Sequence, residues 1–76
     1  MTSQEKKQLR EIISKIEDAQ ADISLMLMQE EDRLDSVGNG ASQIERAIKL
    51  EENVDNLESA EELLGDAITS LEQILE

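Results

Sequence analysis

The chain has 76 residues, with no cysteine, histidine or aromatic residue, and its 19 acidic and 7 basic side chains give a net charge of -12 at pH 7. A chain this short forms one domain at most. It lacks the side chains of disulfides and of most zinc sites, so we expect no cofactor. It also lacks aromatic platforms for bases and small ligands, and its charge repels phosphate backbones. These features predict no nucleic-acid partner and no small-molecule substrate.

The N-terminal region carries Lys6, Lys7 and Arg10 where a signal peptide would need an apolar stretch. The longest apolar stretch, Ile23 to Met28, contains a serine and is too short to span a bilayer. We therefore expect a soluble, cytoplasmic protein with no membrane partner.

Two helices are expected in chain order, because the only cluster of helix breakers, Val37-Gly38-Asn39-Gly40, lies near the midpoint of a chain without proline. The first helix should span about 3–36, the turn 37–41 and the second helix about 42–75, all within one domain of residues 1–76.

The two expected helix starts both fit the capping box S/T-x-x-E, at Thr2-Ser3-Gln4-Glu5 and at Ser42-Gln43-Ile44-Glu45. Gly65-Asp66 could break the second helix. The apolar rhythm continues through Gly65 without a change of phase, which favours one continuous helix.

Apolar residues recur at spacings of three and four in both helices, the pattern of a coiled-coil or bundle seam, with interruptions at Glu30 and Glu61. Adjacent apolar pairs such as Ile12 with Ile13 indicate that each helix contacts two neighbours. The predicted fold is therefore all-α: a long antiparallel, coiled-coil-like helical hairpin that dimerises into a four-helix bundle. The candidate oligomer seam comprises Leu9, Ile12, Ile13, Ile16, Ile23, Met26, Leu27, Leu34, Leu50, Val54, Leu57, Leu64, Ile68, Leu71 and Leu75.

The expected register follows from a turn centred on Asn39, which would place residues side by side when their numbers sum to about 78. Basic residues of the first helix would then face acids of the second, and Arg46 and Lys49 would lie beside Glu30 and Glu31. Exposed pairs of this kind contribute about 0 to 1 kcal/mol each, so they would select the register more than stabilise the fold. The first group of expected pairs joins Lys6, Lys7, Arg10 and Lys15 with Glu62, Asp66 and Glu72.

The second helix is strongly acidic, because no Lys or Arg follows Lys49. This surface could simply keep a small bundle soluble, or it could dock on a basic partner protein. The candidate partner-binding residues are Glu51, Glu52, Asp55, Glu58, Glu62 and Asp66.

Further carboxylates, Glu30, Glu31, Asp32 and Asp35, crowd the end of the first helix. The Asp/Asn alternation of a calcium loop is missing, so no metal site is predicted. The acids from Glu51 superficially resemble the carboxylate ladders of all-α nucleotide pyrophosphohydrolases. Those enzymes need further helices and a base-binding pocket, so no catalytic residue is predicted.

The leading hypothesis for the function is a non-enzymatic protein–protein interaction module, an acidic hairpin that forms a homodimer or homotetramer. The first alternative is an acidic inhibitor or nucleic-acid mimic that blocks a basic surface of a partner protein. The second alternative is a structural assembly subunit.

Overall fold

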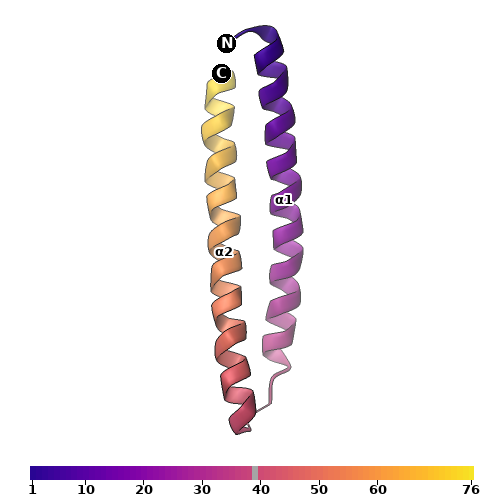
Figure 1. The fold of residues 1–76 in the computed structure, drawn as a ribbon, viewed down its shortest axis with the longest axis vertical. Coiled ribbons are helices and arrows are strands. Elements are labelled where there is room, and N and C mark those ends of the chain that lie inside the picture. The colour runs from indigo at the N-terminus through magenta and orange to yellow at the C-terminus, as the bar shows by residue number, and fades with distance from the viewer. Residues whose placement is uncertain (39) are drawn as a thin grey trace.

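The computed structural model describes residues 1–38 and 40–76, except for the side chain of residue 41. Two long helices, α1 (Ser3–Asp35) and α2 (Ala41–Leu75), run antiparallel as an extended hairpin of 60 × 15 × 13 Å (Figure 1). The described residues contain no strand. The predicted all-α helical hairpin is confirmed, and both helix boundaries lie within one residue of the expected ones. Both termini lie at one end, which we call the terminal end, and the opposite end is the turn end (Figure 1).

The start of α1 confirms the first capping box. The backbone N–H of Glu5 donates to Thr2 Oγ1 at 3.1 Å, and the backbone N–H of Thr2 donates to Glu5 Oε1 at 3.0 Å. This reciprocal pair satisfies two N–H groups that have no partner within the helix.

The start of α2 contradicts the second capping box. The N-cap is Gly40, whose carbonyl accepts from the backbone N–H of Gln43 at 2.9 Å and of Ile44 at 3.1 Å. Ser42 already lies inside the helix, so its hydroxyl is not at the capping position. Gly40 itself has no side chain that could cap α2.

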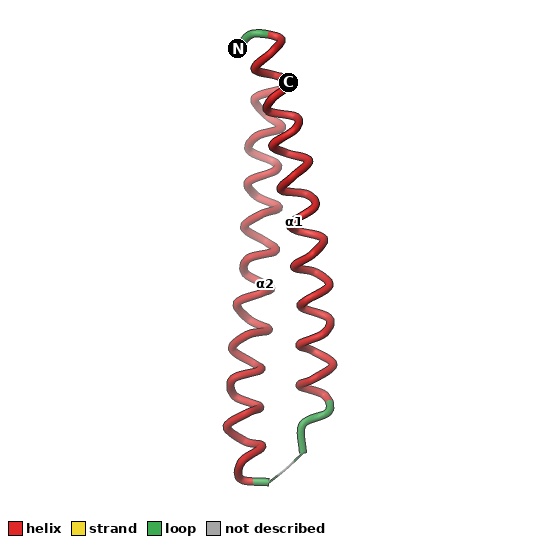
Figure 2. Tube along the Cα trace, turned by 45° about the vertical axis from the view of Figure 1, so that its right-hand side comes forward, coloured by secondary structure: helices red, strands yellow, loops and turns green. Residues whose placement is uncertain are grey.

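The contact between the helices is one continuous seam with alternating spacings of four and three residues, as in a coiled coil. The helices stay side by side after a rotation of 45° (Figure 2). Every side chain of the seam is buried or half-buried. The seam residues are Leu9, Ile13, Ile16, Gln20, Ile23, Leu27, Glu30 and Leu34 of α1, and Ala47, Leu50, Val54, Leu57, Glu61, Leu64, Ile68, Leu71 and Leu75 of α2.

The best-packed part of the seam lies at the terminal end. Leu9, Ile13 and Ile68 form a buried cluster there, against which Ile16, Leu71 and Leu75 pack. Toward the turn end, Leu50 is the one described residue that is buried, with 7% of its surface exposed. The apolar core therefore weakens from the terminal end toward the turn.

The register differs from the expected one. Gln20 and Ser24 bond to Glu61, and Asn53 bonds to Glu30, so contacting residues have numbers that sum to 81–85 rather than 78. Figure 1 shows the reason: the chain descends after α1 ends, so that α2 begins further along the hairpin axis. The first turns of α2 extend beyond α1 (Figure 1). Ile44 and Ile48, near this end of α2, are more than half exposed.

The shifted register also replaces the expected ion pairs. Across residues 1–38 and 40–76, the ion pairs are Arg33 with Glu30 and Lys49 with Glu52, and each pair lies within one helix. The predicted pairing of the basic residues of α1 with the acids of α2 is therefore wrong. Direction and register depend on the seam instead.

The second helix continues through Gly65 without a break, as the apolar rhythm indicates. A Cβ built at Gly65 would lie 3.1 Å from Nε2 of Gln20, so the glycine leaves room for that side chain. Neither described helix is apolar over a stretch long enough to cross a membrane.

Candidate interaction surfaces

Two polar layers interrupt the apolar seam, and the first lies near its middle. Gln20 Nε2 donates to the backbone carbonyl of Glu61 at 3.1 Å, and Ser24 Oγ donates to Glu61 Oε2 at 2.7 Å. Both side chains of α1 thus recognise one residue of α2. A half-buried polar contact of this kind favours one register, because a slipped pairing would leave its polar groups unpaired.

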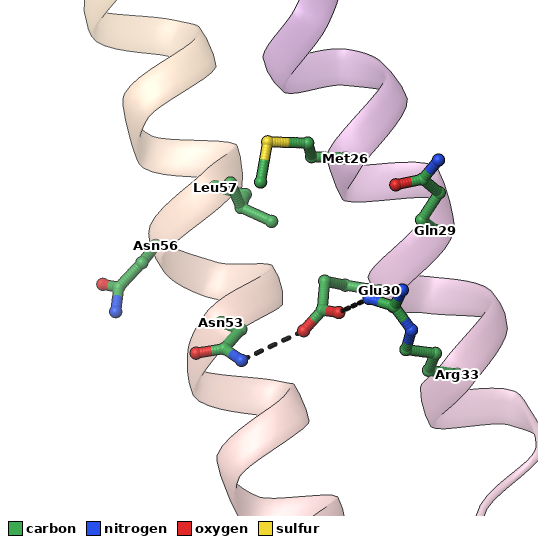
Figure 3. Close-up of a pocket in the computed structure, with 7 residues that line it drawn as sticks. All are labelled: Met26, Gln29, Glu30, Arg33, Asn53, Asn56 and Leu57. Carbon is green, nitrogen blue, oxygen red and sulfur yellow. Dashed lines mark hydrogen bonds and ion pairs between the residues drawn. The ribbon is translucent and has the colours of Figure 1, made fainter.

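The second polar layer lies nearer the turn end and centres on Glu30. Asn53 Nδ2 donates to Glu30 Oε2 at 3.0 Å, and the Arg33 guanidinium forms an ion pair with Glu30 Oε1 (Figure 3). The Glu30 side chain is 13% exposed, against 57% for Arg33. The hydrogen bond from Asn53, followed by that from Arg33, lowers the pKa of Glu30 below its usual 4.5.

An acid titration of Glu30→Gln tests this layer. A carboxyl with a lowered folded pKa adds stability above its unfolded pKa and loses it as the pH falls through the folded value. The difference in free energy of unfolding between wild type and Glu30→Gln should therefore be present at pH 7 and shrink below about pH 4.5. Urea unfolding at pH 7, 5 and 3 measures it, and Glu31→Gln, which removes a neighbouring exposed carboxylate, controls for net charge. A difference that stays constant across this range contradicts the bonds to Glu30.

The second polar layer forms the inner wall of an open groove of about 390 Å³. Met26, Gln29 and Arg33 line it from α1, opposite Asn53 and Asn56 of α2, with Leu57 between the helices (Figure 3). It holds no aromatic anchor for a small ligand. Because all three residues line this groove, Met26 and Arg33 of α1 lie on the same side of the hairpin as Asn53 of α2.

The two rows that border the seam on this side are apolar from Ile12 to Met26 on α1 and from Ala60 to Ile74 on α2. Residues seven apart lie on one face of a helix in a coiled coil. The row of Met26 and Arg33 therefore includes Ile12 and Ala19, and the row of Asn53 includes Ala60, Ala67 and Ile74. Ile12, Met26 and Ile74 are 48–53% exposed, and Leu63 on the adjoining row is 66% exposed. The apolar side face is defined as Ile12, Ala19, Met26, Ala60, Leu63, Ala67 and Ile74.

The acids of α2 avoid the apolar side face. Two rows of α2 lie on this face. They start at Arg46 and Lys49, repeat every seven residues and contain no acid. All six candidate partner-binding residues are exposed. The acidic face is defined as these six residues, Glu51, Glu52, Asp55, Glu58, Glu62 and Asp66.

The candidate oligomer-seam residues fall into two groups. Thirteen lie between the two helices of the hairpin, and Ile12 and Met26 lie outside on the apolar side face. Sequence reasoning did not pair Gln20, Ser24 and Asn53 with their partners. The signal was present for Gln20, because it lies four residues after Ile16 and three before Ile23.

Nowhere in the described ranges do three carboxylates gather closely enough to hold a metal ion. The chain matches no protein-family model, and no curated protein or solved structure shows significant similarity to it.

Proposed function

We propose that this protein is a non-enzymatic protein–protein interaction module that acts as a homodimer or homotetramer of helical hairpins. The observation that carries the proposal is the poor burial within one chain. Leu9, Ile13, Leu50 and Ile68 are the buried apolar residues of the described chain, and no described side chain is completely buried. Nine large apolar side chains are about half exposed or more: Met1, Ile12, Leu25, Met26, Met28, Ile44, Ile48, Leu63 and Ile74.

The surface area supports association. The accessible surface is 5639 Å². A compact monomer of 8.5 kDa would expose about 4,650 Å². The excess of about 1,000 Å² compares with the roughly 800 Å² that each partner buries in a typical stable interface. Packing two hairpins into a four-helix bundle would remove this excess.

The acidic face supplies a second surface, for a partner of opposite charge. Its carboxylates are exposed and gather on the side of α2 away from the apolar side face. A basic protein would be attracted at long range without any enclosed pocket. If that basic surface normally binds nucleic acid, the same contact makes the protein an inhibitor that mimics nucleic acid. The charge segregation is the observation that favours this alternative.

Sedimentation equilibrium between about 1 and 200 μM tests the oligomer. We expect a mass of two or four times 8.5 kDa in the upper part of this range, with helical content followed by circular dichroism on the same samples. A fully helical species of 8.5 kDa at every concentration would overturn the proposal.

A further inference from the structure

We infer that a second copy of this chain packs on the apolar side face with its turn at the opposite end of the dimer, which leaves both acidic faces outside. The inference rests on the proposed homo-oligomer and adds the face and the direction of packing. The occupant is a second copy, because the size, the shape and the charge of the face fit the same face of another hairpin.

The size is that of a dimer interface. The whole side of the hairpin that carries the face measures 60 × 15 Å, or about 900 Å², and a stable interface needs about 800 Å² from each partner. The middle of the face consists of Ala19, Ala60 and Ala67, which are small enough for a partner helix to approach closely. Large side chains project beyond them: Leu63 is 66% exposed and Ile74 is 50% exposed.

The charge pattern excludes the other faces of α2. The outer and far sides of α2 carry its exposed acids, and two such surfaces would repel each other. The apolar side face is the side of α2 without an acid. Only this side can meet its own copy without opposing carboxylates from α2.

The charge pattern also selects the direction. One row of α1 runs from Glu5 through Ile12, Ala19 and Met26 to Arg33, with an acid at the terminal end and a base at the turn end. Copies with their turns at opposite ends bring Glu5 of one row toward Arg33 of the other, which is the self-complementary pattern of a two-fold interface. Copies with their turns at the same end would instead gather the basic turn-end residues Arg33, Arg46 and Lys49 of both chains.

The shape agrees with this direction. The open groove beside Met26 and Leu57 lies on the turn side of the middle of the hairpin (Figure 3). Ile12 and Ile74, each about half exposed, lie on the terminal side. Packing with opposite turns carries these two side chains of one copy toward the groove of the other.

Leu63→Glu tests the face, with Leu25→Glu as its control. Both leucines are more than half exposed, at 66% and 56%, but Leu25 lies on the outer side of α1. We expect Leu63→Glu to weaken self-association at least tenfold in sedimentation equilibrium while the helical content persists, and Leu25→Glu to associate as wild type does. A wild-type oligomer that Leu63→Glu leaves intact overturns the choice of face and leaves the proposed function standing. A monomeric wild type overturns both.

A spin label on Ser42→Cys tests the direction. The chain has no native cysteine, and Ser42 is exposed near the turn end of a 60 Å hairpin. Dipolar spectroscopy of the dimer should give a separation of about 50 to 60 Å, set by the rise of 1.5 Å per residue along the helices. Labels on two adjacent helices lie less than about 30 Å apart. A separation in that range would therefore show that both turns lie at the same end of the dimer.

Discussion

Ile13→Ala should lower the free energy of unfolding by about 2 to 4 kcal/mol. Ile13 is 6% exposed and belongs to the buried cluster with Leu9 and Ile68. A single core of this size contributes only about 3 to 5 kcal/mol, so the variant should be largely unfolded when it is monomeric. Urea unfolding followed by circular dichroism measures the change.

Ile12→Ala is the matched control, because it makes the same substitution at the preceding residue, which is 48% exposed. Within one hairpin it should cost less than about 1 kcal/mol, since its side chain buries little area against α2. Any further loss should grow with protein concentration, because it would arise from the contact with a second copy. If both variants lose the same free energy of unfolding at every concentration, then α1 is not oriented with Ile13 toward α2 and Ile12 away from it.

Reversing Glu58, Glu62 and Asp66 to lysine should slow the association with a basic partner at least tenfold while the hairpin stays folded. The three side chains are exposed and lie outside the seam. For the wild type, association should slow steeply as ionic strength rises, because the Debye length falls to about 8 Å at 0.15 M. The partner is first isolated with wild-type protein on a column, and association rates are then measured by surface plasmon resonance at several salt concentrations.

A charge-matched control separates the acidic face from net charge alone. Glu11, Asp18 and Asp32 on the outer side of α1 are exposed, and reversing them to lysine changes the net charge by the same amount. If both triple variants slow association equally, the acidic face is not the docking site. If neither does, the carboxylates serve solubility. A captured partner that also binds nucleic acid through the same surface favours the inhibitor alternative.

The sequence was sufficient to predict the two helices, because helix breakers cluster in one place and apolar residues keep a helical period on either side of it. It could not decide which apolar row faces the other helix, since Ile12 and Ile13 begin equally good rows. The deciding positions are Gln20, Glu30 and Glu61, which are polar and therefore hide the continuous seam. Their partners become visible only when the two helices are placed together.

The register could not be predicted from residue counts, because the connection adds length along the hairpin axis as well as reversing the chain. The displacement separates Arg46 and Lys49 from their expected partners, Glu30 and Glu31. The acidic face could be predicted without the register, since it belongs to α2 alone. The apolar side face could not, because its two rows come from different helices and adjoin only in the observed pairing.

The placement of the buried cluster at the terminal end has a consequence for the order of folding. Ile13 and Ile68 are separated by 55 positions in the chain, and closing a loop of that length costs about 1.5 kcal/mol more than closing one of 10 residues. The segments near the turn meet first. Their contact is partly polar, because it includes Glu30 and its partners, and Leu50 is its one buried apolar side chain among the described residues. If the two helices pair from the turn toward the termini, the chain gains its main stabilisation only at the last step. Partly paired hairpins should therefore not accumulate during folding.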